Sequence, residues 1–157
     1  MSGFEIRLGT EDDAEGVAGL IHEAFLPFRR HYTDGAFEYT TPGAEIVRGR
    51  FAEGPIWVAE EDGLMVGTVS GLPEGERFYI RSMAVKPGLQ GRGVGRRLLA
   101  ELEKHAREAG FEKLYLYTMF VLVGARRLYK KNGFYIVRET LPEEWYGVGG
   151  LEMEKDL

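Results

Sequence analysis

The stretch VKPGLQGRGVGRRLL, residues 85–99, places three glycines directly before an apolar helical pattern. Gly91, Gly93 and Gly95 occupy every second position. Glycine costs backbone entropy on folding and is a poor helix former, so another requirement must keep it here. The amides at a helix start have no partner inside the helix, and together with the helix dipole they form an anion site. Because no Cβ intervenes, the stretch predicts a cradle for a phosphate or pyrophosphate.

Two known phosphate-binding motifs do not match the sequence of this stretch. A nucleotide-triphosphate loop needs Gly-Lys followed by Ser or Thr, which the chain lacks. The dinucleotide fingerprint is G-x-G-x-x-G in a first βα turn, whereas the spacing here is G-x-G-x-G and lies deep in the chain. A glycine-rich turn without a ligand is the alternative. Arg92 and Arg96 favour an anion, since guanidinium groups give charge-assisted hydrogen bonds.

Apolar periodicity around this stretch predicts a single α/β domain over residues 1–157, with a mixed sheet of about seven strands and about four helices. Strand patterns cover residues 4–8, both sides of an Asp62-Gly63 hairpin within 55–73, 77–87, 113–120, 134–139 and 151–157. Helix patterns cover residues 17–28, a segment that starts at Thr41-Pro42, 94–109 and 125–131.

Composition narrows the classes of function. The net charge is −5, which disfavours a general nucleic-acid binder. There is no cysteine, so disulfides, thiolate catalysis and cysteine metal sites are excluded. The three histidines lie at positions 22, 31 and 105 without ligand spacing, and no metal is expected. No signal peptide or membrane span is found in the sequence, which predicts a cytoplasmic protein without a membrane partner.

Two motifs, QGRGVG at residues 90–95 and ARRLYKKNGF at residues 125–134, resemble those of the GNAT superfamily of acetyl-CoA-dependent N-acetyltransferases. QGRGVG, residues 90–95, fits the signature Q/R-x-x-G-x-G/A, between a strand and a helix. ARRLYKKNGF, residues 125–134, is similar to the family's A-x-x-L/F-Y-x-x-x-G-F element. The order of predicted elements also matches over nearly the whole chain. The resemblance implies the acyl-CoA N-acyltransferase fold and acetyl-CoA as cosubstrate, with no metal.

In that family the strand before the signature binds the pantetheine arm through main-chain groups, and the signature amides hold the pyrophosphate. The resemblance therefore implies these cofactor-binding residues: Met83, Ala84, Val85, Gln90, Gly91, Arg92, Gly93, Val94, Gly95 and Arg96. It also implies that the strand splays at this point, so that a main-chain N–H can polarise the thioester carbonyl.

Tyr129 is the catalytic residue that the resemblance implies. A tyrosine at this place in similar proteins protonates the departing thiolate, and a phenol with an ordinary pKa of about 10 keeps its proton at neutral pH. The same tyrosine would also suit the buried face of an amphipathic helix. The implied reaction is direct transfer to an amine, without a covalent enzyme intermediate.

Three points about the base, the cofactor contacts and the acceptor stay open. The strand FYIRSMAV carries no acid, so the general base is either a water chain or one of the loop acids Asp34, Glu38, Glu143 and Glu144. The asparagine that many relatives carry before the tyrosine element is missing. A small amine, an amino acid, a peptide N-terminus and a protein lysine all remain open as acceptors, and a homodimer is allowed. A catalytically silent acetyl-CoA-binding sensor or interaction module is the alternative function.

Overall fold

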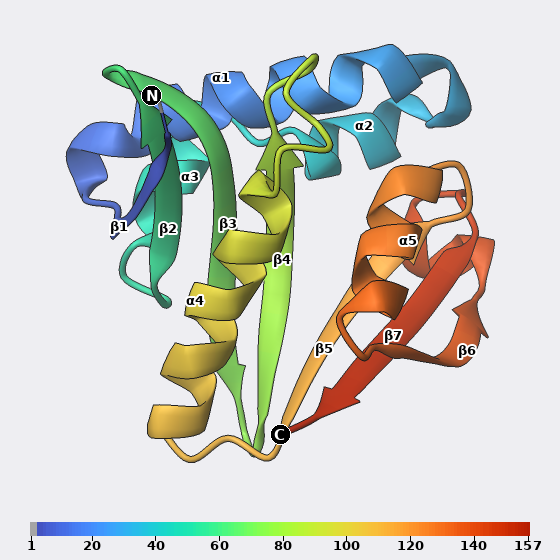
Figure 1. Ribbon diagram of the computed structural model, residues 1–157. Coiled ribbons are helices and arrows are strands. Elements are labelled where there is room, and N and C mark those ends of the chain that lie inside the picture. Colours follow the sequence, from blue (N-terminus) through green and yellow to red (C-terminus); the bar gives the residue numbers. More distant parts are fainter. Residues whose placement is uncertain (1–2) are drawn as a thin grey trace.

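The computed structural model describes residues 3–157, and its frame is one seven-stranded sheet in the order β1-β2-β3-β4-β5-β7-β6 (Figure 1). The strands are β1 Glu5–Leu8, β2 Ile56–Glu61, β3 Leu64–Glu74, β4 Arg77–Val85, β5 Lys113–Met119, β6 Tyr135–Thr140 and β7 Gly150–Asp156. Within residues 3–157, only β4 and β5 pair in parallel, and the other neighbours are antiparallel. The predicted mixed sheet is confirmed.

Helices cover both faces of this sheet. They are α1 Ala14–Phe25, α2 Asp34–Thr40, α3 Ala44–Arg50, α4 Val94–Glu108 and α5 Val123–Lys131. The amphipathic α4 buries Leu98 and Leu102 against strand residues such as Phe78. A second apolar cluster joins α1 and α3 to the opposite face through residues such as Ile21 and Val47.

The α2 helix was not predicted, because its seven residues are too few for a clear helical period. Its start is fixed by Thr33, whose hydroxyl accepts a hydrogen bond from the Ala36 amide at 3.0 Å. The helix expected to start at Thr41-Pro42 begins later, at Ala44, with Gly43 as its N-cap. The start at Thr41-Pro42 was therefore wrong by two to three residues.

The β2–β3 hairpin turns at Asp62-Gly63, as predicted. Both residues have positive φ, 52° and 78°, which is the conformation that a tight two-residue hairpin requires.

The central strands β4 and β5 separate soon after they meet. They pair only from Arg77 to Tyr79 on β4, against Lys113 to Tyr115 on β5. Beyond these residues the strands diverge, and Figure 1 shows β5 leaning away from β4 toward the end that carries α5. This divergence confirms the splay that was expected near residue 83, and it leaves the second half of β4 without a neighbour on one side.

Candidate active site

A cavity of about 670 Å³ fills the opening between β4 and β5. Its walls come from the loop before α4, from β4 and β5, from α5, and from the segments around α1 to α3. It therefore reaches from the α4 side of the sheet to the opposite face. The cofactor-binding residues predicted from sequence all line it, except Arg92.

The glycine loop presents bare backbone at one end of the cavity. Gly91 and Gly93 have φ of +85° and +86°, in the left-handed region that favours glycine. A Cβ at Gly91 would meet nothing within 4 Å, so open space lies beside this backbone. Gly93 caps the N-terminus of α4, where unpaired amides and the helix dipole favour an anion. The Gln90 side chain supports the turn, because its Oε1 accepts from the Gly88 amide at 2.9 Å.

The third glycine of the loop also has a packing role. Gly95 has no positive φ, and a Cβ there would lie 3.0 Å from Leu128 Cδ2. Its missing side chain lets α4 approach α5 closely. Gly95 thus shapes the wall of the cavity by packing.

The two arginines of the loop also differ. Arg92 makes a bidentate ion pair with Glu61, at 2.9 and 2.6 Å, and it does not line the cavity. Arg96 lines the cavity, and its Nη2 would lie 3.7 Å from a Cβ at Gly93. Of the two predicted guanidinium contacts to a pyrophosphate, the geometry therefore favours the one from Arg96.

The backbone of β4 bulges at Ser82, which has φ +57°. One residue of β3 there opposes two residues of β4, so the strand bends. The Lys86 amide donates to the Val66 carbonyl at 2.9 Å, toward β3. Because successive amides of a strand point to opposite sides, the N–H groups of Met83 and Val85 face the slot that β5 has vacated.

Tyr129 lies on α5 and lines the same cavity. The residue is 6% exposed, and its hydroxyl makes no hydrogen bond to any other residue in the range 3–157. Burial raises the pKa of this phenol above its ordinary value. Tyr129 therefore holds its proton throughout the neutral pH range. It lies beside the vacated half of β4, which is the part of this strand that β5 does not pair with.

The opposite end of the cavity is aromatic and basic. Its aromatic lining consists of Phe25, Phe28, Tyr32, Tyr39, Tyr79, Tyr117 and Trp145. Several of these rings touch, with centroids 5.8 Å apart for Tyr79 and Tyr117 and 5.0 Å apart for Tyr117 and Trp145. Arg50, Arg81 and Ser82 complete this end, and the Arg50 Nη1 donates to Ser82 Oγ at 2.9 Å.

The loop segments 28–42 and 139–150 contribute Phe28, Tyr32, Tyr39 and Trp145 to this end. Sequence reasoning did not single out the residues that come from β4, β5 and α3. The only available signal was strand alternation: Tyr79 and Arg81 on β4 lie on the face opposite the core residues Phe78 and Ile80. Arg50 ends a helix pattern, where a basic residue is ordinary. Nothing local distinguishes it.

Comparison with known proteins settles the family. A family model described as the acetyltransferase (GNAT) family matches residues 18–134. The chain belongs to the GNAT family. The fold agrees with this assignment: the PaiA N-acetyltransferase from Thermoplasma acidophilum, solved in complex with coenzyme A, superposes with a TM-score of 0.82 at 19% identity, over 99% of each chain. A ribosomal-protein-alanine N-acetyltransferase from Brucella melitensis gives a TM-score of 0.76 at 25% identity, over 98% of this chain and 99% of that one.

The curated GNAT relatives are longer proteins than this chain. Mycothiol acetyltransferase from Propionibacterium freudenreichii subsp. shermanii is 30% identical over 148 residues, which are 86% of this chain and 44% of that protein. Probable N-acetyltransferase family 8 member 5 from Mus musculus is 33% identical over 101 residues, 60% of this chain and 44% of that protein. The chain thus spans less than half the length of these two relatives.

The loop acids considered as general bases do not reach this GNAT cavity. None of Asp34, Glu38, Glu143 and Glu144 lines it. Asp34 is paired with Arg29, and Glu144 is paired with Arg138 at 2.8 Å. That arginine and the Leu141 amide lower the pKa of Glu144 to about 2, so its carboxylate is a poor proton acceptor.

The charged residues that line the cavity are all basic: Arg50, Arg81, Arg96, Arg127 and Lys131. No carboxylate of residues 3–157 is among the lining residues. The bare backbone of the glycine loop and the basic groups near it fit a polyphosphate. In the part of the chain that the structure describes, no His, Asp and Glu gather in a group suited to a metal. Nor does any described helix have the length and apolar character to cross a membrane.

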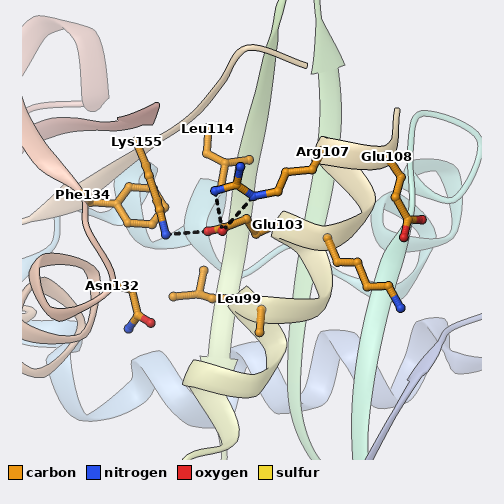
Figure 2. Close-up of a pocket in the computed structure, with 10 residues that line it drawn as sticks. Leu99, Glu103, Arg107, Glu108, Leu114, Asn132, Phe134 and Lys155 are labelled. Carbon is orange, nitrogen blue, oxygen red and sulfur yellow. Dashed lines mark hydrogen bonds and ion pairs between the residues drawn. The ribbon is translucent and has the colours of Figure 1, made fainter. Parts of the chain in front are cut away.

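A second hollow, of about 490 Å³, lies between α4 and β7. Figure 2 shows Lys155 and Arg107 converging on the Glu103 carboxylate across it. The Lys155 Nζ is 2.6 Å from Glu103 Oε1, and the Arg107 Nη2 is 3.1 Å from Glu103 Oε2. These charges satisfy one another, so the hollow offers an ion-paired contact between helix and sheet rather than a binding site.

Proposed function

We propose that the chain is an acetyl-CoA-dependent N-acetyltransferase that acts on an amine of a small molecule or peptide. The single observation that carries this proposal is the cavity itself. It joins an anion-binding loop, an opened strand and a buried tyrosine to an aromatic chamber on the other face of the sheet. Two substrates that enter such a cavity from opposite ends meet at the vacated half of β4, and this proximity supplies much of the acceleration.

The chain's own residues suit acetyl-CoA at one end. The amides of the glycine loop at Gly91 and Gly93 hold the pyrophosphate, with Arg96 beside them. The unpaired main-chain groups of Met83 and Val85 bind the pantetheine arm in the way that a neighbouring strand would. When bound, acetyl-CoA supplies an activated acetyl thioester.

Two groups support the chemistry at the thioester. A main-chain N–H of β4, at Met83 or Val85, polarises the acetyl carbonyl and stabilises the negative charge that develops on its oxygen. Tyr129 donates its proton to the departing thiolate. Its raised pKa keeps that proton available, and its buried hydroxyl has no competing partner among residues 3–157.

Deprotonation of the amine proceeds without a lining carboxylate. Burial raises the pKa of the chamber phenol Tyr32 to about 12, and it raises the pKa values of Tyr79 and Tyr117 as well. Such phenols are protonated at neutral pH and accept no proton from an ammonium group. The acceptor therefore enters as the free amine, or loses its proton to water in the chamber.

Thiol release from acetyl-CoA in the presence of an amine panel tests this function. The Tyr129→Phe variant is expected to lower kcat about 100-fold while the KM for acetyl-CoA changes little. The loss should shrink above about pH 8.5, where a thiolate leaves without a proton. Tyr135→Phe is the matched control, because it removes a phenol hydroxyl from an exposed site on β6.

The outcomes separate the possible functions. Equal kcat for Tyr129→Phe and the parent protein at every pH would remove Tyr129 from the mechanism. Tight acetyl-CoA binding with no thiol release for any amine would instead indicate the silent binding module. The names of relatives, which include a mycothiol acetyltransferase and a ribosomal-protein-alanine N-acetyltransferase, cover both small-molecule and protein acceptors. The panel therefore contains both kinds.

A further inference from the structure

The acceptor chamber contains a buried guanidinium that has no carboxylate partner among residues 3–157. Arg50 is 7% exposed, and its one side-chain hydrogen bond goes to the neutral hydroxyl of Ser82. No acid of residues 3–157 forms an ion pair with it. A buried charge is costly unless it is paired, so most buried arginines have an anionic partner. This one faces the cavity instead.

A second guanidinium beside it is only partly satisfied. The Nη2 of Arg81 bonds Glu53 Oε1 at 2.7 Å, toward the surface, where the glutamate side chain is 48% exposed. The Arg81 Nε is buried without any hydrogen-bond partner in the described chain. Such an orphaned donor marks a place where a further acceptor group belongs.

The two guanidiniums act on each other as like charges. Burial lowers the pKa of Arg50 to about 10, and the charge of Arg81 adds to the shift, yet Arg50 stays charged at neutral pH. Glu53 balances one of the two positive charges, and no carboxylate lines the chamber to balance the other. One positive charge with free N–H donors is therefore left for a ligand that enters this end of the cavity.

The position of this charge limits the size of the ligand. Arg50 is bonded to Ser82, and Ser82 directly precedes Met83, whose N–H faces the slot for the thioester. Neighbouring Cα atoms are about 3.8 Å apart. Consider a ligand whose anionic group contacts Arg50 while its amine attacks the thioester. Only a few bonds can separate the anionic group from the amine in such a ligand. Tyr39, Tyr79 and Trp145 close the space around it with apolar surface.

We propose that Arg50 and Arg81 form an anion-binding subsite and that the acceptor is a compact amine with a carboxylate, of the amino-acid class. This inference rests on the proposed acetyltransferase function and narrows its substrate. The guanidinium pair binds the carboxylate, which is the partner that arginine donors match best. The amine is then directed at the vacated half of β4.

The test compares amino acids with their carboxamides, which differ at the carboxylate. Thiol release is measured for the twenty amino acids and their amides in the parent protein, in Arg50→Gln and in Arg81→Gln. We expect each arginine variant to lower kcat/KM for the acids by roughly 10- to 100-fold relative to the amides. The change in the acid-to-amide ratio is the readout, because it cancels the different basicities of the two kinds of amine.

Controls distinguish recognition from folding. Arg48→Gln removes an exposed arginine from the same helix and should leave the ratio unchanged. Arg50→Gln should unfold at the same temperature as the parent protein or at a higher one, because it removes an unpaired buried charge. If Arg50→Gln fails to fold, Arg81→Gln gives the same readout from the other side of the subsite.

A binding arm separates this inference from the enzyme function. Calorimetry with the CoA-saturated protein measures affinity for the same acids and amides without turnover. Binding of acids that Arg50→Gln loses, with no thiol release, would support the subsite and overturn the enzyme. Turnover of amides and acids with an unchanged ratio in both arginine variants would overturn the subsite and leave the enzyme. The absence of both binding and turnover for every acid would also overturn the subsite.

Discussion

The two ends of the central cavity are built in opposite ways. The end at the glycine loop is made of backbone from one continuous segment, in which Gly91 and Gly93 adopt left-handed conformations just before α4. The end at the chamber is made of side chains from separate elements, among them Arg50 from α3, Tyr79 from β4 and Tyr117 from β5. The splay of β4 from β5 connects the two ends.

The two ends therefore place different demands on the sequence. A phosphate is bound by amides that every residue supplies, so the loop needs only the right backbone path. An acceptor is recognised by particular side chains, and these can change without disturbing the fold.

The largest effect is expected at Gly93, where a matched pair of variants separates charge from shape. Gly93→Asn and Gly93→Asp have nearly the same size, and both tolerate the φ of +86° better than other side chains do. Asp adds a negative charge beside the pyrophosphate and competes for Arg96, whose Nη2 would lie 3.7 Å from the new Cβ. We expect Gly93→Asn to weaken acetyl-CoA binding about tenfold, and Gly93→Asp about 1,000-fold. Calorimetric titration measures both.

Equal losses for the two variants would mean that only the shape of the loop matters, and the anion site would be wrong. The comparison should also depend on salt, because exposed charges are screened. The gap between Asn and Asp is therefore expected to narrow at 1 M salt. A circular-dichroism melt for each variant checks that both remain folded.

The same contrast shows what the sequence could reveal. The loop, the hairpin at Asp62-Gly63 and the tyrosine on α5 were predictable because each depends on residues close together in the chain. The seven strands followed from alternation and from apolar runs. The pairing of Arg92 with Glu61 was not predictable, since it joins residues 31 positions apart. This pairing turns the Arg92 side chain to Glu61, and Arg92 is not among the residues that line the cavity.

The chamber was beyond prediction for a related reason. Arg50 and Arg81 come together only because α3 packs beside β4, and neither position differs in sequence from an ordinary surface arginine. The packing role of Gly95 was not predictable either, because its closeness to Leu128 depends on how α4 approaches α5. Local patterns give the elements and the backbone site, and tertiary packing decides the side-chain site.

A smaller effect is expected in the pH profile, which tests the absence of a lining carboxylate. If the acceptor reacts as the free amine, kcat/KM should rise about tenfold from pH 6 to pH 7 and level off near the pKa of that amine. The plateau should lie near pH 8 for an α-amine and above pH 10 for a lysine side chain. A carboxylate base would instead give a rise near pH 4 to 5 and a plateau by pH 6, which would contradict this arrangement.

Glu144→Gln is the control for that profile. In the parent protein the pKa of Glu144 is about 2, so this carboxylate stays ionised over the whole pH range of the assay. Its titration therefore cannot produce a rise in kcat/KM there. We expect the same profile for the variant and the parent protein. The phenols whose pKa values are raised, Tyr32 and Tyr79, produce no change in kcat/KM below pH 9 either.

The smallest effect is expected in the second hollow, where charge serves structure rather than binding. Burial raises the pKa of Glu103, but the hydrogen bonds from Lys155 and Arg107 outweigh it and leave the pKa below its ordinary value. Its ionised form therefore stabilises the fold above the unfolded-state pKa of about 4.3, and this contribution is lost as the pH falls through the lower folded value. Glu103→Gln should lower the free energy of unfolding at pH 7 by about 0.5–1 kcal/mol, or the Tm by about 2 °C.

The decisive comparison is between stability and turnover in the same variant. Thiol release by Glu103→Gln should equal that of the parent protein at 25 °C, because the hollow shares no wall with the loop or the chamber apart from Asn132. The stability difference should also shrink as the pH falls below the unfolded-state pKa of about 4.3. A fall in acetyl-CoA affinity without a change in Tm would instead make the hollow an extension of the cofactor site. The charges of the second hollow could then no longer be described as purely structural, in contrast to the unpaired charges that bind ligands in the central cavity.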